Sequence, residues 1–379
     1  MQRELLLSVL ANSPSRLYGN FVSLPDDVLS AIQCIESFGA TVCLNDNKIE
    51  VIPPIHSVIK DEISIHVGES GFLIRNIVSI GFLFARKLLI HARGTLLTRE
   101  LHMNEALLTQ LGLVKRSNHG EWPLILEQIQ PCQKHIQLDA SATSQIASGV
   151  LIRLAKSTGE RSLCLKNLVS TPYLEMTVDN LMYRGVNLSW VDNCISFDDN
   201  CQIQGCEIQI DGDWSGAAFL FVAGAINNPI VIEGMRSDSV QADMKILEAI
   251  KDAGALLSQE GNRYEVAPAS LHAFEFDATE CPDLFPPLVA LAAYCKGVTK
   301  IKGVNRLIHK ESNRGLTLQD VFGKMGIQVE LEGDMMLVYG GVQPKGANVH
   351  SHHDHRIAMA AAIAALGADG PVHIADAEA

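Results

Sequence analysis

The chain has 379 residues, a net charge of −13 at pH 7 and 47% hydrophobic residues. That length accommodates two domains of ordinary size, and the hydrophobic content is typical of globular proteins with large cores. The negative charge argues against nucleic acid or an acidic membrane surface as the main partner, although it leaves room for a local cationic pocket. The longest apolar runs fall short of the roughly 18 residues of a membrane span, so we expect no membrane partner and a cytoplasmic location.

Nine cysteines are present, an odd number without a CxxC pair. This usage predicts reduced cysteines in the core of a cytosolic protein.

Five segments share one pattern, in which an amphipathic helix ends at a glycine and a short strand follows. They are "IQCIESFGATVCL" (32–44), "NEALLTQLGLVKR" (104–116), "VDNLMYRGVNLSW" (178–190), "ILEAIKDAGALLS" (246–258) and "LQDVFGKMGIQVE" (318–330). The period is about 72 residues, and the glycines are Gly39, Gly112, Gly185, Gly254 and Gly326. Glycine there suits a left-handed helix C-terminus. A second strand-like stretch follows, such as "NRYEVAP" (262–268), so each unit is predicted as strand–helix–strand–helix–strand–strand.

Acidic residues recur at the same period where the chain enters the next helix. They are Asp139, Asp211, Asp283 and Asp354, and "HVGESGFLIR" (66–75) holds the matching place in the first repeat. Each aspartate is interpreted as an N-cap for free backbone amides. The repetition leaves a second interpretation open, because helix N-termini that point into one space attract anions.

Two helix starts carry polar clusters suited to a phosphate. "DASATSQ" (139–145) offers hydroxyls and an amide, although capping alone explains them too. "GESGFLIR" (68–75) pairs glycines with Arg75, and neither GxxxxGK nor GxGxxG is present.

"VHSHHDHR" (349–356) has the residue types of a transition-metal site. Adjacent residues seldom face one ion together, so we expect instead a surface turn after which Arg356 opens a helix.

"HKESNR" (309–314) is either a solvated charged loop or a site that holds a carboxylate among cations. The second interpretation requires Asp283 as well, since two carboxylates among arginines suit proton transfer on an anionic substrate.

Six motifs together resemble the 5-enolpyruvylshikimate-3-phosphate (EPSP) synthase family. They are "DASATSQ", "STPY" (170–173), "GDWSGAAF" (212–219), "CPDLFPPLVALAA" (281–293), "HKESNR" and "HHDHRIAMA" (352–360). The resemblance runs from Arg3 to the last residue. It implies an α/β fold of two pseudo-threefold domains built from βαβαββ units, an inside-out α/β barrel. The domains would be residues 1–209, with three units, and 210–379, with two units and part of a third; the active cleft would lie between them.

The family transfers the enolpyruvyl group of phosphoenolpyruvate to the 5-hydroxyl of shikimate 3-phosphate and releases phosphate. The resemblance implies these two small-molecule partners, a monomer, no metal and no organic cofactor. Shikimate 3-phosphate would be held by Arg3, Ser141, Thr143, Ser144, Gln145, Ser170 and Tyr173. Phosphoenolpyruvate would be held by Gly71, Arg75, Arg99, Arg314 and Arg356, because guanidinium groups bind carboxylate and phosphate through two hydrogen bonds. Asp283 would accept the hydroxyl proton and Glu311 would serve the enol carbon, with Lys310 and His355 as neighbours.

The sequence also departs from the family pattern. The unusual residues are Phe72, Asn76, Glu100, Thr143 and Asn313. Two family lysines, one in a Ser-Lys-Ser stretch before the arginine that Arg3 matches and one beyond "ADAEA", are not among the 379 residues. We expect them in flanking sequence; a degenerate copy that only binds shikimate 3-phosphate is the alternative. A UDP-N-acetylglucosamine enolpyruvyl transferase is disfavoured, because "RKLLIHARGTLLTRE" (86–100) lacks that family's reactive cysteine.

Overall fold

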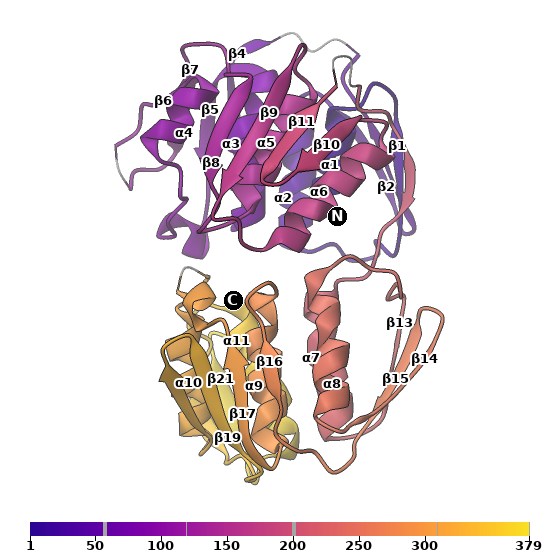
Figure 1. Cartoon of the computed structure of the whole chain (residues 1–379), viewed down its shortest axis with the longest axis vertical. Helices are drawn as coiled ribbons and strands as arrows, with labels where there is room; N and C mark the ends of the chain where they lie inside the picture. Colours follow the sequence, from indigo (N-terminus) through magenta and orange to yellow (C-terminus); the bar gives the residue numbers. More distant parts are fainter. Residues whose placement is uncertain (56–58, 119, 199–201, 309, 379) are drawn as a thin grey trace. The chain divides into compact units, whose positions relative to one another are not determined.

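The computed structural model describes residues 1–55, 59–118, 120–198, 202–308 and 310–378. The chain forms two compact units, Met1–Ile210 and Asp211–Ala379. The first unit runs from indigo to magenta in Figure 1 and the second from orange to yellow.

The predicted repeat appears as a recurring four-stranded sheet. Its first two strands are parallel, and an antiparallel hairpin pairs alongside the second of them. In the first unit, β4-β5-β7-β6 is made of Lys60–His66, Ala85–His91, Leu124–Gln128 and Leu113–Lys115. The sheet β8-β9-β11-β10 is made of His135–Asp139, Arg161–Lys166, Cys194–Phe197 and Leu188–Val191. In the second unit, β16-β17-β19-β18 is made of Glu275–Asp277, Gly297–Lys302, Met335–Gly340 and Gln328–Glu332.

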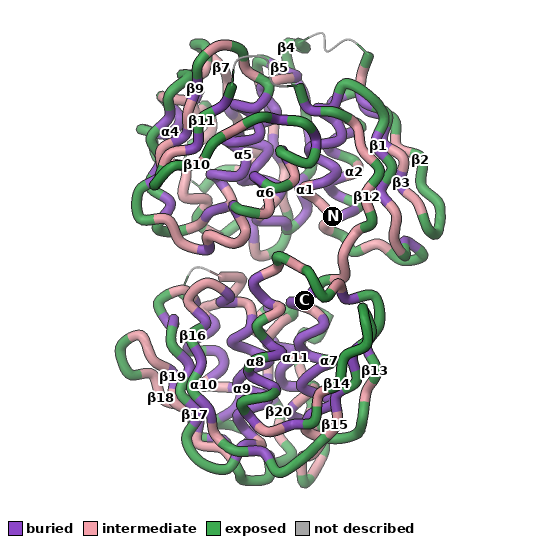
Figure 2. Tube along the Cα trace, turned by 45° about the vertical axis from the view of Figure 1, so that its right-hand side comes forward, coloured by how far each residue is buried: buried purple, intermediate pink, exposed green. Residues whose placement is uncertain are grey.

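One sheet of the first unit takes its outer strand from the far end of that unit. The sheet β12-β1-β3-β2 consists of Glu207–Gln209, Ser15–Tyr18, Lys48–Ile52 and Thr41–Asn45. The strand β12 runs parallel to β1 and pairs Ile208 with Leu17, and Figure 2 shows these strands side by side. The last repeat segment therefore completes the first sheet.

Two smaller sheets complete the second unit. The sheet β13-β15-β14 consists of Ile230–Glu233, Arg263–Ala267 and Leu256–Glu260, and β20-β21 of Ala347–His350 and Val372–Ala375.

Helices form the interior of each unit. Those of the first unit are α1 (Gln2–Val9), α2 (Asp26–Ser37), α3 (Gly71–Ile80), α4 (Glu105–Leu111), α5 (Gln145–Ala155) and α6 (Thr171–Tyr183). Those of the second are α7 (Trp214–Ile226), α8 (Ile246–Asp252), α9 (Phe285–Tyr294), α10 (Arg314–Lys324) and α11 (His355–Ala364). Short 3₁₀ turns include η3 (Ala242–Lys245), η4 (Pro282–Leu284) and η5 (Val304–Leu307).

The burial pattern explains this inside-out arrangement. Almost every residue of α5 and α9 is buried, as expected of helices that are apolar all round. Strands such as β4 and β15 instead alternate buried and exposed residues, because one face of each sheet meets solvent. Figure 2 shows the buried residues concentrated on the helices. Helix packing is close: a methyl group added at Gly149 of α5 would lie 2.7 Å from Asn76 Cα of α3.

The prediction for the repeat glycines is confirmed. All five have positive φ, from 72° at Gly112 to 102° at Gly39, and a strand follows each of them. Glycine reaches this left-handed region without the steric cost that a Cβ imposes.

The N-cap interpretation is confirmed for one aspartate and wrong for three. Asp354 caps α11 by accepting a hydrogen bond from Arg356 N. Asp139 closes a turn on Ser141 N, Asp211 accepts from Arg236 N, and Asp283 lies inside η4. The N-cap positions of α5 and α7 fall later, at Ser144 and Asp213, because the chain makes a short turn between strand and helix; of the two, only Asp213 caps with its side chain.

The prediction of reduced core cysteines is wrong for several positions. Cys164 of β9 and Cys194 of β11 form a disulfide, since the antiparallel register sets them directly opposite each other with 4.1 Å between their Cα atoms. Cys43 is exposed, whereas Cys34, Cys281 and Cys295 are buried thiols.

Among the described residues, no helix has the length and apolar character needed to cross a membrane.

Candidate functional site

Two arginines of the first unit meet at Gly71, the first residue of α3. A methyl group added at Gly71 would lie 2.8 Å from Arg75 Nη1 and 3.1 Å from Arg99 Nη2, so any larger residue there would displace one or both guanidinium groups. Arg75 donates to Gln145 Oε1 at 2.7 Å and to the carbonyl oxygen of Glu100 at 3.1 Å. The structure thus brings together four residues that the sequence had assigned to substrates.

Arg3 occupies a second position in the same unit. Its Nε donates to Thr177 Oγ1 at 2.8 Å and its Nη2 to the carbonyl oxygen of Tyr173 at 3.0 Å. The guanidinium lies 5.2 Å from the centre of the Phe72 ring, a cation–π contact. Burial lowers the pKa of Arg3 to about 10, which leaves the group charged at neutral pH.

The predicted hydroxyl groups stand at two helix N-termini. Ser144 precedes α5 and Ser170 precedes α6; both are buried, and neither side chain caps its own helix. Ser170 has φ of 54°, an uncommon conformation for a residue with a Cβ. Thr143 Oγ1 accepts a hydrogen bond from Gln145 N, and Ser141 is exposed. Free amides at helix N-termini and nearby arginines favour the binding of an anion.

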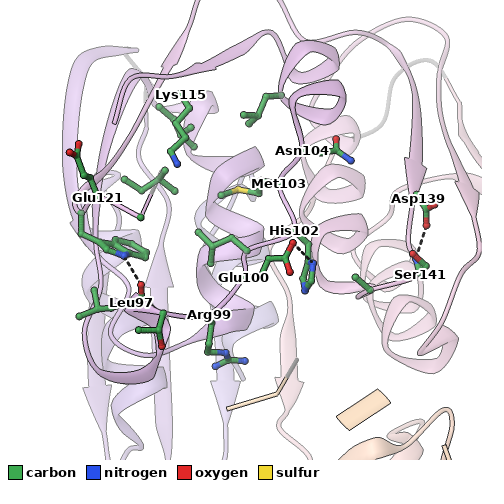
Figure 3. Close-up of a pocket in the computed structure, with 18 residues that line it drawn as sticks. Leu97, Arg99, Glu100, His102, Met103, Asn104, Lys115, Glu121, Asp139 and Ser141 are labelled. Carbon is green, nitrogen blue, oxygen red and sulfur yellow. Dashed lines mark hydrogen bonds and ion pairs between the residues drawn. The ribbon is translucent and has the colours of Figure 1, made fainter. Parts of the chain in front are cut away.

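A pocket opens beside these residues, with a cavity volume of about 710 Å³. Arg99, Ser141 and Glu121 lie at its edge, and Met103 and Lys115 lie between them (Figure 3).

The second unit gathers carboxylates and cations around Asp283. Its Oδ1 accepts hydrogen bonds from Lys310 Nζ at 2.9 Å and from Arg314 Nη1 at 2.8 Å. Arg356 Nη2 lies 3.7 Å from its Oδ2. The charged loop "HKESNR" therefore does belong to a cluster that includes Asp283; His309 lies outside the described residues.

Arg314 is the centre of this cluster. It is 1% exposed and contacts three carboxylates, those of Asp283, Glu311 and Asp354. Asp354 is fully buried, accepts from Arg314 Nε at 2.8 Å and also accepts from Ser312 Oγ at 3.0 Å. Asp354 thus links the start of α11 to the arginine that opens α10.

The charges of the cluster govern its protonation. Burial alone would raise the pKa of Asp283, but the charges of Lys310, Arg356 and Arg314 hold it well below its ordinary value. Asp283 is therefore an ionised, weakly basic carboxylate while those three cations surround it. Desolvation, and then the charge of Arg356, lower the pKa of His355, so its imidazole is neutral at pH 7.

A hydroxyl group that the sequence did not single out holds Arg356. Ser215 Oγ donates to Asp213 Oδ1 at 2.8 Å and accepts from Arg356 Nη2 at 2.8 Å. "GDWSGAAF" contains both residues, but only the packing of α7 against α11 reveals their connection to Arg356. The sequence also did not indicate three other contacts of predicted site residues. Asp354 binds Arg314, and both Thr177 and the ring of Phe72 contact Arg3.

The predicted turn between β20 and α11 is confirmed, with positive φ at His352 and His353. His350 Nε2 lies 2.9 Å from Asp376 Oδ2, and His352 Nε2 lies 3.2 Å from Asp320 Oδ2. Across the described part of the chain, no group of three or more His, Cys, Asp or Glu side chains is arranged to hold a metal ion.

Comparison with known proteins gives a consistent result. The family model for EPSP synthase (3-phosphoshikimate 1-carboxyvinyltransferase) matches residues 1–379. A 3-phosphoshikimate 1-carboxyvinyltransferase of Thermococcus kodakarensis is 33% identical over 99% of this chain and 90% of its own length. The enzyme of the same name from Brachyspira hyodysenteriae is 30% identical over 99% of this chain and 89% of its own length.

A solved structure of EPSP synthase from Acinetobacter baumannii has the same fold. It superposes with a TM-score of 0.79 and 22% identity, covering 100% of this chain and 89% of that one. The inside-out α/β architecture implied by the family resemblance is confirmed.

Proposed function

The chain belongs to the EPSP synthase (3-phosphoshikimate 1-carboxyvinyltransferase) family, and we infer from this that it is an enzyme of the shikimate pathway. It transfers the enolpyruvyl group of phosphoenolpyruvate to the 5-hydroxyl of shikimate 3-phosphate and releases phosphate. A monomeric state and a cytoplasmic location are part of the same proposal. The observation that carries the chemistry is the cluster of Asp283 with Lys310, Arg314 and Arg356.

The first unit supplies the binding groups for anions in this proposal. Shikimate 3-phosphate is bound by Arg3, the hydroxyls at the starts of α5 and α6, Gln145 and Tyr173. Arg75 and Arg99, which share the space that Gly71 leaves open, bind phosphoenolpyruvate. Guanidinium groups suit this role because they form paired hydrogen bonds with carboxylates and phosphates.

The second unit supplies proton transfer in this proposal. Asp283 accepts the proton of the 5-hydroxyl, and Glu311 exchanges a proton with the enol carbon. A carboxylate surrounded by three cations is a poor base. In this proposal the substrate anions therefore also raise the basicity of Asp283. When they draw Lys310 and Arg356 toward themselves, the field on Asp283 weakens and its basicity rises. Arg314 joins in binding phosphoenolpyruvate only by exchanging one of its carboxylate partners.

The test is phosphate release in the presence of both substrates, compared between the wild type and Asp283→Asn. We expect kcat to fall at least about a hundredfold, the usual contribution of a general base, with the circular dichroism spectrum unchanged. Asp277→Asn is the matched control, because Asp277 is an exposed carboxylate paired with Lys302 in the same unit. Near-normal turnover of Asp283→Asn would refute the role of Asp283. Tight binding of shikimate 3-phosphate by the wild type without phosphate release would favour a non-catalytic binding protein.

A further inference from the structure

We propose that the pocket next to Arg99 is a second ligand site, which takes an anion on an apolar body, such as an aromatic carboxylate. It lies within the first unit, between the segment 97–104, the hairpin of β6 and β7, and the end of β8 (Figure 3). Its cavity volume of about 710 Å³ is within the range of small-molecule sites, roughly 300–1,000 Å³.

About half of the residues that line the pocket are apolar. Leu108, Leu124 and Leu126 are buried, and Met103 and Trp122 are half-buried beside them. The indole nitrogen of Trp122 donates to the carbonyl oxygen of Leu97 at 3.1 Å, which fixes the ring as a wall. The partly exposed surfaces of Met103 and Trp122 favour a ring or a branched hydrocarbon, because their apolar area leaves water on binding.

The carboxylates that line the pocket are already engaged by the protein. Glu121 accepts from the backbone and side-chain nitrogens of Asn118, at 3.1 and 2.9 Å. Asp139 accepts from Ser141 N and from Asn167 Nδ2, and Glu100 pairs with His102 at 3.5 Å. Because the donors from Asn118, Ser141 and Asn167 are uncharged, they occupy carboxylate oxygens without cancelling the negative charge. Recognition of an anion therefore depends on a cation of the pocket.

Lys115 is different. It projects from β6 into the pocket and is half-buried. Among the described residues, its ammonium group makes no hydrogen bond and no ion pair within 4.0 Å; it interacts with Glu121 only through the longer-range field. A half-buried ammonium with no partner within 4.0 Å gains a charge-assisted hydrogen bond from an anionic ligand, so Lys115 is the group that would recognise the ligand's charge.

None of the residues assigned to the substrates lines the part of the pocket around Lys115 and Trp122. Arg99 and Ser141 stand at the edge, whereas Lys115, Trp122 and the three leucines lie on elements that carry none of the predicted substrate residues. A bound anion would also contact the segment that carries Arg99, so occupancy is expected to change the response of the enzyme to phosphoenolpyruvate.

The experiment uses 2-naphthylacetate as the probe and the protein labelled with 5-fluorotryptophan. The chain has three tryptophans, so each ¹⁹F resonance is assigned with one Trp→Phe variant. We expect the probe to shift the Trp122 resonance and to leave that of Trp214, which is buried in the second unit, unchanged. Lys115→Met should weaken binding about tenfold or more, and Lys115→Arg should restore most of it.

Three controls distinguish an anion site at Lys115 from nonspecific apolar binding and from the substrate site. Lys60→Met, which removes an exposed lysine of β4, should leave binding unchanged. Equal affinity for the uncharged 2-naphthylacetamide, or unchanged affinity in Lys115→Met, would overturn the proposal. Strictly competitive displacement of the probe by shikimate 3-phosphate or phosphoenolpyruvate, with no plateau at saturating substrate, would also overturn it, because the cavity would then belong to the substrate site; coupling between separate sites gives a plateau. These outcomes do not depend on turnover, so they remain distinct from a failure of the proposed function.

Discussion

Arg314 was predicted to bind a substrate, and in the structure its ion pairs also stabilise the fold. The sequence predicts it as a substrate-binding arginine, whereas the structure shows its guanidinium buried among three carboxylates. No pattern in "HKESNR" indicates that Asp354, forty residues later, supplies two of those contacts. The sequence identified the residue types of the cluster, but its internal pairing depends on the tertiary packing of α10 against α11.

Removing this arginine should therefore lower the stability of the fold, in addition to any effect on substrate binding. We expect Arg314→Ala to lower the free energy of unfolding by about 3–5 kcal/mol, because Asp354 would stay buried without its partner. Lys310→Ala should cost much less, since the Lys310 side chain is 24% exposed and water replaces its contact. Urea unfolding of both variants checks this; equal losses would contradict the central position of Arg314.

The low pKa of Asp283 predicts how the free energy of unfolding changes at acidic pH. Its folded-state pKa lies well below the value of about 3.9 expected in the unfolded chain. The contribution of its ionised form to stability is thus fully present above about pH 4 and is lost as the pH falls through the folded-state pKa. The difference in unfolding free energy between the wild type and Asp283→Asn should shrink between pH 6 and pH 3. A difference that stays constant over that range would show that the cations do not stabilise this carboxylate.

The helix–glycine–strand element was the part of the fold most open to prediction from sequence. Its signal is local, because helix periodicity, a left-handed glycine and a following strand all lie within about thirteen residues. The helix starts were less predictable. Asp211 and Asp213 are both plausible caps by residue type, and the length of the preceding turn decides in favour of Asp213. The Cys164–Cys194 disulfide was missed because it depends on the register of two strands about thirty residues apart.

Helix α10 offers a matched pair of glycines for testing this element. Gly326, just after the helix, has φ of 80°, and a methyl group there would lie 3.3–3.5 Å from Lys345 side-chain atoms. Gly323 is within the helix and has no atom within 4 Å of the added methyl group. We expect Gly326→Ala to destabilise the protein by about 1–2 kcal/mol. Gly323→Ala should stabilise it by about 0.5–1 kcal/mol. Thermal denaturation of the two variants gives the comparison, and a stabilising Gly326→Ala would contradict the left-handed cap.

At the scale of the whole molecule, the disulfide belongs to only one of the two units. It closes a loop across a sequence separation of 30 residues within the first unit. Its removal by Cys164→Ser with Cys194→Ser should lower the stability of that unit by about 2–4 kcal/mol. Hydrogen exchange followed by mass spectrometry should show faster exchange in β9 and β11 and unchanged protection in α9. Cys43→Ser is the control, as Cys43 is an exposed free thiol. Uniform loss of protection in both units would show that they do not unfold independently.

The pairing of β12 with β1 has a consequence for synthesis on the ribosome. Arg16 and Glu207, which form an ion pair across these strands, are 191 residues apart in sequence. While the chain emerges, β1, β2 and β3 pair early, but the edge of β1 stays open until nearly the whole first unit has been translated. An unpaired strand edge is a template for association with other chains. The nascent protein therefore exposes this strand edge until Gln209 leaves the exit tunnel, and a pause in translation shortly before that point would prolong the exposure.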